Sequence, residues 1–263
     1  MIMTCPAILR SLLLLILCLG LPERLLAGQE LILVGPEFPP YYQHDAQGRV
    51  SGELVRLYDI IVRHAGYHWR GYIVPTKRVM KSLADGHFNS SILVKNPLLE
   101  QSGTVLTSPD PVSEMILNLY FHTGRFSDIE SFTVSKDLMK NSKVAVMRGY
   151  GYGGMRSWLA EPENKITTVE LDNFSSAIRL LESGRVDFAL LYDVNFQAGQ
   201  KELHRKAMNI SSATLAHVPL YFHISTSIKN TDQVMDRLMN SYRDLVAKGI
   251  LASAYHQPHM VIQ

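Results

Sequence analysis

The sequence predicts an α/β protein built of two lobes. Strand-like and helix-like segments alternate along most of the chain, and they do so in two separate runs. Two long extended stretches, 115–122 and 218–226, lie between and after these runs and have the length to cross from one lobe to the other. The chain has 263 residues, which is enough for two small lobes.

The first run is a βαβαβ unit. Its short apolar strands are closed by turn residues such as Pro36, and its helices show apolar residues at helical spacing and stop at Gly66 and Gly86. Right-handed crossovers would place its strands in one small parallel sheet. In chain order the predicted elements are a strand at 31–35, a helix over 52–64, a strand at 69–74, a helix over 78–85 and a strand at 91–94.

The second run repeats this alternation, and a C-terminal helix follows it. A glycine-rich turn over 149–154 separates the first strand of this run from its first helix. The predicted elements are a strand at 143–147, a helix over 155–160, a strand at 167–170, a helix over 175–183 and a strand at 187–192. The last helix is expected to begin with Thr231 as N-cap and to run to Lys248.

The two crossing stretches predict a discontinuous organisation. Lobe 1 is expected to comprise 28–117 and 220–263, with the C-terminal helix packing on the first run. Lobe 2 is expected to be inserted over 118–219. No strong internal repeat is present at the level of residues.

The N-terminus has the pattern of an export signal. Arg10 precedes an apolar run over 11–21 that Pro22 interrupts, and this run is too short for a membrane-spanning helix. We therefore expect a signal peptide over 1–27, cut after Ala27, and an uncleaved anchor is the main alternative. Both cysteines, Cys5 and Cys18, fall inside this segment, which would leave the mature chain without disulfide, thiol nucleophile or cysteine-bound metal.

The composition favours recognition of a small molecule. The 26 basic and 24 acidic residues are mixed along the chain, so the net charge of +2 gives no footprint for nucleic acid. Ten histidines are present without a His-Glu cluster at metal-ligand spacing, and we expect neither a metal nor a cofactor. A monomer is expected.

Six segments together resemble solute-binding protein family 3, the amino-acid type of periplasmic binding protein. These are LILVGPEFPPYY at 31–42, Gly-Glu-Leu at 52–54, VPTKR at 74–78, VAVMRGYGYG at 144–153, SGRVDFALLYD at 183–193 and LVAKGILASAYHQ at 245–257. The resemblance implies a type II periplasmic binding protein, in which each lobe is a small, mainly parallel sheet flanked by helices and two hinge strands join the lobes. It also implies a periplasmic protein that captures a small polar solute between its lobes for an ABC-type transporter.

The ligand residues are expected beyond the carboxyl ends of the strands, where open α/β sheets bind their ligands. In the family an arginine after the third strand holds a carboxylate, but Leu99 stands there in this chain, so Arg78 or Lys95 would have to serve instead. One of the two tyrosines after the first strand is expected in the site and the other in the core. The rule that ligands bind beyond the carboxyl ends of the strands, called here the strand-end rule, also selects Asn195. The expected ligand residues are Glu37, Phe38, Tyr41, Tyr42, Arg78, Lys95, Asn96, Arg148, Gly149, Tyr150, Gly151, Tyr152 and Asp193.

Two other functions remain open beside transport. One is a periplasmic enzyme on the same fold, such as a dehydratase of small carboxylic acids, with Glu37 or Asp193 as acid or base. The other is a ligand-dependent partner of a membrane sensor. Because the chain shows no close acid pair, no Gly-x-Ser-x-Gly motif and no thiol outside the signal segment, we expect that it is not an enzyme.

Overall fold

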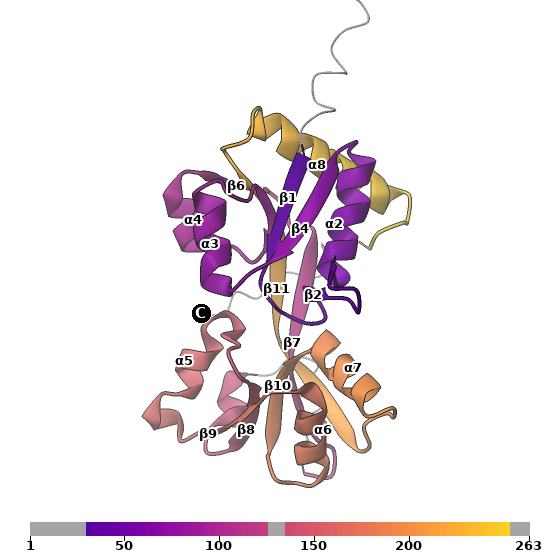
Figure 1. Cartoon of the computed structure of the whole chain (residues 1–263). Coiled ribbons are helices and arrows are strands. Elements are labelled where there is room, and N and C mark those ends of the chain that lie inside the picture. Colours follow the sequence, from indigo (N-terminus) through magenta and orange to yellow (C-terminus); the bar gives the residue numbers. More distant parts are fainter. Residues whose placement is uncertain (1–29, 126–134, 253–263) are drawn as a thin grey trace, which may run out of the picture.

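The computed structural model describes residues 30–125 and 135–252. It consists of two lobes, one above the other in Figure 1, and the long strands β7 (Ser113–His122) and β11 (Ile210–Ser225) run between them. This confirms the predicted two-lobed α/β fold. In the described part of the chain, no helix is both long and apolar enough to cross a membrane. The predicted signal peptide, 1–27, lies outside the described residues.

Lobe 1 is built on a parallel arrangement of three strands. The central strand of the three is β1, and its Leu33 pairs with Gly71 of β4 on one side and Ser90 of β5 on the other. The helix α8 packs against α2 and the end of β11. The elements are β1 (Glu30–Gly35), β2 (Gln43–His44), β3 (Val50–Ser51), α2 (Glu53–His64), β4 (His68–Ile73), α3 (Thr76–Ala84), β5 (Ser90–Leu93), α4 (Pro97–Ser102), β6 (Val105–Thr107) and α8 (Thr231–Ala247).

Lobe 2 places its helices around a smaller group of strands. Here β10 is parallel to β8 and antiparallel to β7, while β9 lies at the edge beside β8. The elements are the 3-10 turns η1 (Lys136–Met139), η2 (Tyr152–Gly154) and η3 (Pro162–Asn164), the strands β8 (Lys143–Met147), β9 (Thr167–Leu171) and β10 (Phe188–Tyr192), and the helices α5 (Met155–Leu159), α6 (Phe174–Glu182) and α7 (Asp193–Glu202).

The hinge strands join both lobes into one mixed sheet. β7 pairs antiparallel with β11 from Ser113–Leu220 to His122–Ile210, and the end of β11 then pairs with β5 and β6 in lobe 1. The strand order is β4-β1-β5-β11-β7-β10-β8-β9. The sequence predicts two separate crossings, whereas the structure pairs them, because antiparallel pairing satisfies their backbone groups between the lobes. The lobe boundaries at 117/118 and 219/220 fall within these strands and stay a prediction.

Three local differences from the predicted elements have simple causes. The helix α7 begins directly at the end of β10, with Tyr192 as N-cap and no capping side chain, so no start signal marks it. The short α4 is one and a half turns long, below the length at which periodicity is visible. Asn230, in the left-handed conformation, is the N-cap of α8, while the Thr231 hydroxyl donates to the Ile228 carbonyl oxygen over 2.9 Å.

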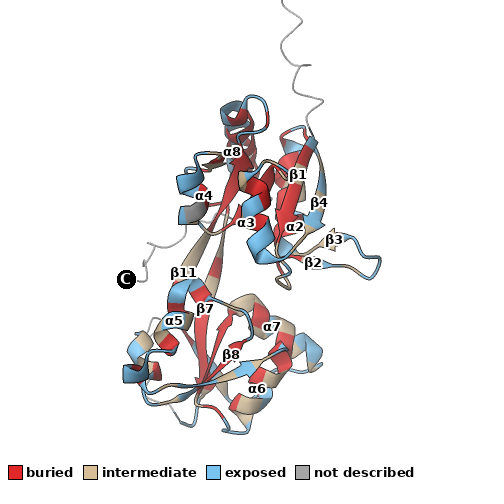
Figure 2. Cartoon of the chain, turned by 60° about the vertical axis from the view of Figure 1, so that its left-hand side comes forward, coloured by how far each residue is buried: buried red, intermediate tan, exposed pale blue. Residues whose placement is uncertain are grey.

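Leu99 lies in the core of lobe 1. Its exposed fraction is 1%, and it packs in a small apolar cluster beneath α3 and α4. Figure 2 shows the same pattern more widely, with buried strands inside each lobe and exposed residues on the outer helix surfaces. The residue at the position where the sequence resemblance implied a carboxylate-binding arginine is therefore a core residue. The other members of its cluster are Val34, Val79, Leu83, Leu93 and Val105.

The turn that carries Tyr41 depends on Gly52. Gly52 has φ of +126°, and a Cβ there would collide with the carbonyl oxygen of Tyr41. We expect Gly52→Ala to lower the free energy of unfolding by about 2–3 kcal/mol, from overlap plus backbone strain. Gly48→Ala is the matched control, since Gly48 also has positive φ but open space around it, and about 1 kcal/mol is expected there. Urea unfolding would measure both free energies. Equal losses in the two variants would contradict the close contact between position 52 and the Tyr41 carbonyl oxygen.

Because the imidazole of His223 is buried, we expect the protein to lose stability at mildly acidic pH. His223 is fully buried in β11, and burial lowers its pKa from 6.5 to about 4. Because the folded pKa is depressed, the unfolded chain takes up the proton first, so stability falls as pH drops from about 6.5 to about 4. The loss should approach about 3 kcal/mol.

The measurement is urea unfolding at pH 7 and pH 4.5. His223→Gln should lose less stability over this interval than the unmodified protein, because the titrating group is gone. His87→Gln, which changes an exposed histidine, should behave as the unmodified protein does. Identical pH dependence in all three proteins would show that His223 does not titrate in this way.

Candidate functional site

The lobes meet through a cluster of aromatic side chains. The Phe38 ring of lobe 1 lies 4.7 Å from the ring centre of Tyr150 and 5.9 Å from that of Tyr192, both in lobe 2. Tyr41 stacks on Phe38 with 5.6 Å between the ring centres, and the two rings are nearly parallel. Tyr152 lies 5.7 Å from Tyr150 and 5.9 Å from Tyr192. We call Phe38, Tyr41, Tyr150, Tyr152 and Tyr192 the interlobe aromatic cluster.

The strand-end rule explains why these rings converge. Phe38 and Tyr41 follow β1, Tyr150 and Tyr152 follow β8, and Tyr192 ends β10. Since each strand delivers its next residues to the same side of its sheet, both lobes present aromatic residues to the space between them. Tyr192 was not among the expected ligand residues, although its place at the end of a strand was the available signal.

The two tyrosines after β1 have different positions. The Tyr42 side chain is inside lobe 1, where its hydroxyl donates to the Ile92 carbonyl oxygen over 2.9 Å and accepts from the Ile92 N–H over 3.2 Å. Tyr41 instead packs on Phe38 at the lobe contact. Tyr41 is thus the member of the pair that belongs to the aromatic cluster, and Tyr42 is a core residue.

The glycine-rich turn of lobe 2 holds Tyr150 and Tyr152 in place. The Tyr152 hydroxyl accepts a hydrogen bond from the Met147 N–H over 2.7 Å, which closes the turn back onto β8. Gly149 and Gly151 are exposed, and no atom lies within 4 Å of where their side chains would begin. The turn can therefore approach a ligand with its backbone at these two glycines.

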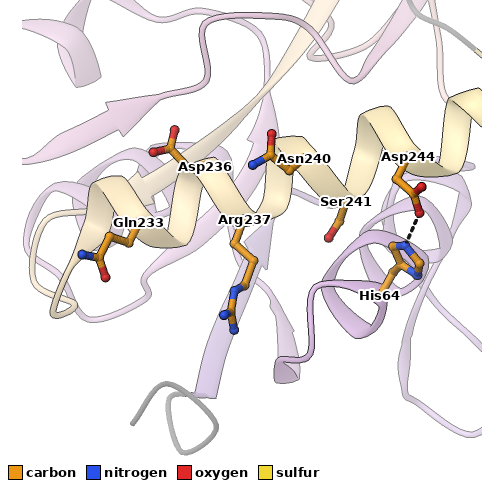
Figure 3. Close-up of a pocket in the computed structure, with 7 residues that line it drawn as sticks. All are labelled: His64, Gln233, Asp236, Arg237, Asn240, Ser241 and Asp244. Carbon is orange, nitrogen blue, oxygen red and sulfur yellow. Dashed lines mark hydrogen bonds and ion pairs between the residues drawn. The ribbon is translucent and has the colours of Figure 1, made fainter. Parts of the chain in front are cut away.

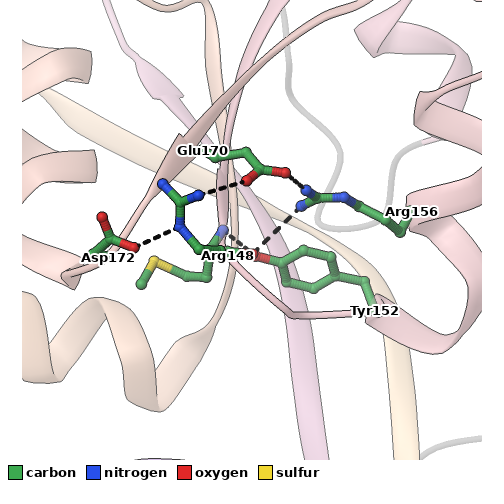
Figure 4. Close-up of polar contacts among 6 residues, drawn as sticks. Arg148, Tyr152, Arg156, Glu170 and Asp172 are labelled. Atoms are coloured by element: carbon green, nitrogen blue, oxygen red, sulfur yellow. Dashed lines mark hydrogen bonds and ion pairs between the residues drawn. The ribbon is translucent and has the colours of Figure 1, made fainter.

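Arg148 forms ion pairs with Glu170 of the edge strand β9 and with Asp172, which directly follows that strand. Its Nε donates to Asp172 Oδ1 over 2.7 Å, and a terminal nitrogen lies 3.5 Å from Glu170. Figure 4 shows Glu170 between the guanidinium groups of Arg148 and Arg156. The two arginines and the two carboxylates balance one another in charge, and the ion pairs of Arg148 are exposed and therefore weak.

Asp193 brings a carboxylate to the edge of the cluster. It is the first residue of α7, half-buried, and burial and the nearby Glu114 raise its pKa, against the effect of backbone hydrogen bonds. The pKa of Tyr41 is raised chiefly by burial and secondly by Asp193, which places this carboxylate near the Tyr41 ring. Burial also raises the pKa of Tyr192 to about 12, so its phenol is uncharged at neutral pH.

Four expected ligand residues lie in lobe 1 and are not members of the interlobe aromatic cluster. Glu37 is exposed and lies 3.5 Å from His44 Nδ1, and Arg78 is exposed on α3. The Lys95 Nζ lies 4.6 Å from the centre of the Tyr221 ring. The Asn96 carbonyl oxygen accepts from two N–H groups at the start of α4. Their roles in ligand binding stay predictions.

A hydrogen bond between Asn195 and Pro39 also joins the lobes. Asn195 lies in the first turn of α7 and is fully buried, and its Nδ2 donates to the Pro39 carbonyl oxygen over 3.0 Å. Pro39 directly follows Phe38, so this bond lies beside the aromatic cluster. No group of three potential metal ligands is found among the described residues.

Two surface hollows lie elsewhere on lobe 1. Figure 3 shows the first, between α2 and α8, where His64 Nε2 and Asp244 Oδ2 are 2.7 Å apart. The second is bordered by the hairpin β2–β3 and the edge strand β4. Neither contains a residue of the aromatic cluster. Besides His64 and Asp244, the first hollow is lined by Gln233, Asp236, Arg237, Asn240 and Ser241.

Comparisons with known proteins agree with this architecture. No family model matches the chain. It is 22% identical over 179 residues to the arginine-binding periplasmic protein of Mannheimia haemolytica, covering 67% of this chain and 68% of the relative. An ancestral arginine-binding protein bound to arginine superposes with a TM-score of 0.58 at 21% identity, covering 84% of this chain and 93% of that one. The chain has the periplasmic binding protein fold.

A third comparison corrects the expectation that the chain is not an enzyme. An ancestral amino-acid-binding protein, described as a precursor of cyclohexadienyl dehydratase, superposes with a TM-score of 0.55 at 21% identity, covering 84% of this chain and 90% of that one. A binding protein of this fold has thus preceded an enzyme. The absence of familiar catalytic motifs in the sequence was the wrong criterion, because a cleft that binds a solute can become catalytic through a few side chains.

Proposed function

We propose that this protein binds a small polar or amphipathic solute between its lobes, at the interlobe aromatic cluster. The observation that carries the proposal is that both lobes supply rings to one place, from the carboxyl ends of their strands. Aromatic surface with a few polar groups is typical of small-molecule sites. Here the polar groups are Asp193, the Asn195 amide and the open backbone at Gly149 and Gly151.

Binding would act through the hinge strands. A solute that contacts both lobes favours the closed arrangement by the difference between its affinities for the closed and open states. The paired strands β7 and β11 are the continuous connection about which the lobes would turn. Phe38 and Tyr150, whose ring centres lie 4.7 Å apart across the lobes, would have to separate for a solute to enter between them.

A more specific proposal concerns the cellular location of the protein and its membrane partner. We propose that the protein is a periplasmic monomer that delivers its solute to the permease of an ABC-type transporter. The support comes from the relative, whose name gives a periplasmic location and arginine binding. Capture on membranes that contain the cognate permease, with and without solute, would test this, and solute-dependent capture by a sensor receptor instead would favour a signalling role.

A second candidate function is an enzyme of the dehydratase type acting on small carboxylic acids. It is favoured by the raised pKa of Asp193, because a carboxyl group that titrates closer to neutrality can donate and accept protons during turnover. Product formation from small hydroxy acids, lost in Asp193→Asn, would establish it. Stoichiometric binding without product would favour the first candidate.

Isothermal titration with a panel of amino acids, amines, small peptides and organic acids tests the proposed site. We expect saturable binding with one solute per chain by at least one class. Failure of every class to bind, with the protein folded by circular dichroism, would contradict the proposed function.

A further inference from the structure

The edge strand β4 has unpaired backbone groups on its outer side. It is the first strand in the order of the sheet and lies at the margin of lobe 1 in Figure 2. The Val74 N–H donates to the Gly35 carbonyl oxygen of β1 over 3.0 Å. Because successive residues of a strand point their N–H and C=O groups to opposite edges, those of Trp69, Gly71 and Ile73 face away from β1. No backbone partner for these three residues is found in the described part of the chain.

The outer side of β4 opens into the second surface hollow of lobe 1. Trp69, Gly71 and Ile73 all line this hollow, which has a volume of about 520 Å³. The hairpin β2–β3 contacts the face of β4, since Val50 lies 3.3 Å from where a Cβ of Gly71 would be. The two hairpin strands pair with each other and not with β4. The outward backbone groups therefore stay open to a further strand.

The length and register of β4 make it a template for such a strand. Its six residues pair with β1 in one continuous register without a bulge, and none of them is proline. Natural proteins usually interrupt or cover an exposed edge of this kind, because it can pair with another chain. An extended peptide can add to such an edge through main-chain hydrogen bonds.

The side chains around the hollow favour an acidic partner. Three arginines and one histidine line it, and none of the described residues that line it is acidic. Each arginine pairs with a carboxylate of the chain, but these carboxylates, on Asp45, Asp59 and Glu30, do not line the hollow. Exposed ion pairs of this kind are weak, so carboxylates of a partner can replace them. The basic lining residues are Arg49, Arg63, Arg70 and His44.

We propose that β4 binds an extended acidic segment of a partner protein, which adds to the sheet as a further strand and places its carboxylates against Arg49, Arg63 and Arg70. A second copy of this chain fits less well, because it would bring the same arginines to the junction and like charges would meet there. Since every second side chain of a strand lies on one face, the carboxylates are expected at alternate positions of the segment. This surface is separate from the interlobe aromatic cluster, so the proposal does not depend on the proposed function.

The test uses a synthetic peptide with alternating carboxylates, acetyl-ETEVETE-amide. The chain contains two tryptophans, and Trp158→Phe leaves Trp69, which lines the hollow, as the fluorescent reporter. We expect saturable binding with one peptide per chain, and no binding by a peptide with lysine in place of each glutamate. The acidic peptide N-methylated at its five central residues keeps its charges but loses its N–H donors, and it should bind at least about tenfold more weakly.

Arg70→Gln tests the charge contact, and Arg243→Gln is its matched control. The two side chains are 55% and 54% exposed and each forms an exposed ion pair, but Arg243 lies on α8 and does not line the second hollow. We expect Arg70→Gln to weaken binding of the acidic peptide by about three- to fivefold and Arg243→Gln to leave it unchanged.

Ile73→Pro tests the main-chain contact. It removes an outward N–H while the bonds from β4 to β1 remain, and it should weaken peptide binding by about fivefold. Ile73→Val keeps the N–H and should bind as the unmodified protein does. The N-methylated peptide tests the same contact from the other side if Ile73→Pro does not fold.

Several results would overturn the proposal. One is the absence of saturable binding by the acidic peptide. Others are equal binding of the N-methylated or the lysine peptide, and equal effects of Arg70→Gln and Arg243→Gln, because the contact would then not be an added acidic strand. Dimerisation of the protein through β4, abolished by Ile73→Pro, would assign the edge to a second copy instead.

Discussion

Replacing Phe38 with alanine is expected to weaken binding of the preferred solute by about 30- to 100-fold. Phe38 is the ring through which lobe 1 contacts lobe 2, since it meets both Tyr150 and Tyr192. Its removal takes away one face of the proposed site and the apolar contact that accompanies closure. Central aromatic residues of this kind carry a large share of binding energy. Isothermal titration with the tightest solute of the panel measures the change.

Two variants sharpen this experiment. Tyr72→Ala removes an aromatic residue of comparable size that is 42% exposed on the edge strand β4, and it should leave the affinity unchanged. Tyr150→Phe keeps the ring and removes the hydroxyl, so a loss of less than about fivefold is expected if stacking carries the contact. Wild-type affinity in Phe38→Ala would mean that the solute binds away from the cluster.

Leu99→Arg is expected to lower the free energy of unfolding by about 3–5 kcal/mol. The substitution introduces the residue type that binds a carboxylate in the family that the sequence resembles, but it places the charge in the apolar cluster beneath α3 and α4. The residues that pack on Leu99 there are aliphatic, so the guanidinium would lose its hydration on burial among them. Urea unfolding gives the loss, and titration with amino acids should show no new carboxylate binding.

Glu100→Arg is the matched control, because Glu100 is the exposed neighbour on the same helix. A change within about 0.5 kcal/mol is expected there. Leu99→Met, which conserves volume, should cost less than about 1.5 kcal/mol. Tight amino-acid binding by a stable Leu99→Arg protein would instead place position 99 at the site and contradict its assignment to the core.

The strand-end rule predicted much of the candidate site. Phe38, Tyr41 and Tyr150 come together between the lobes as their places after β1 and β8 indicate. The rule works because parallel strands deliver their following residues to one edge, whatever the details of packing. It cannot tell which of two adjacent tyrosines turns inward, because that depends on the space beneath the strand. Gly35 and Ile92 provide that space for Tyr42.

Charged residues were the least predictable. Lys95 was expected as a possible anion clamp and Arg148 as a ligand residue. In the structure Arg148 pairs with Glu170 of β9 and with Asp172, which directly follows β9, and Lys95 lies over Tyr221. Long flexible side chains take partners from strands that are distant in sequence, and sequence spacing does not reveal those partners. The bond from Asn195 to Pro39 could not be predicted either, because its two residues are 156 positions apart in the sequence.

The sequence by itself determined the alternation of strands and helices, the two lobes and the aromatic character of the strand ends, because these follow from local periodicity and from the residues that close each element. Only the tertiary structure decided that β7 and β11 pair into one sheet, that Leu99 is buried, and that Asn195 bonds to Pro39 across the lobes. These features depend on contacts between segments far apart in the chain, where packing and hydrogen-bond satisfaction select among many partners that the sequence allows.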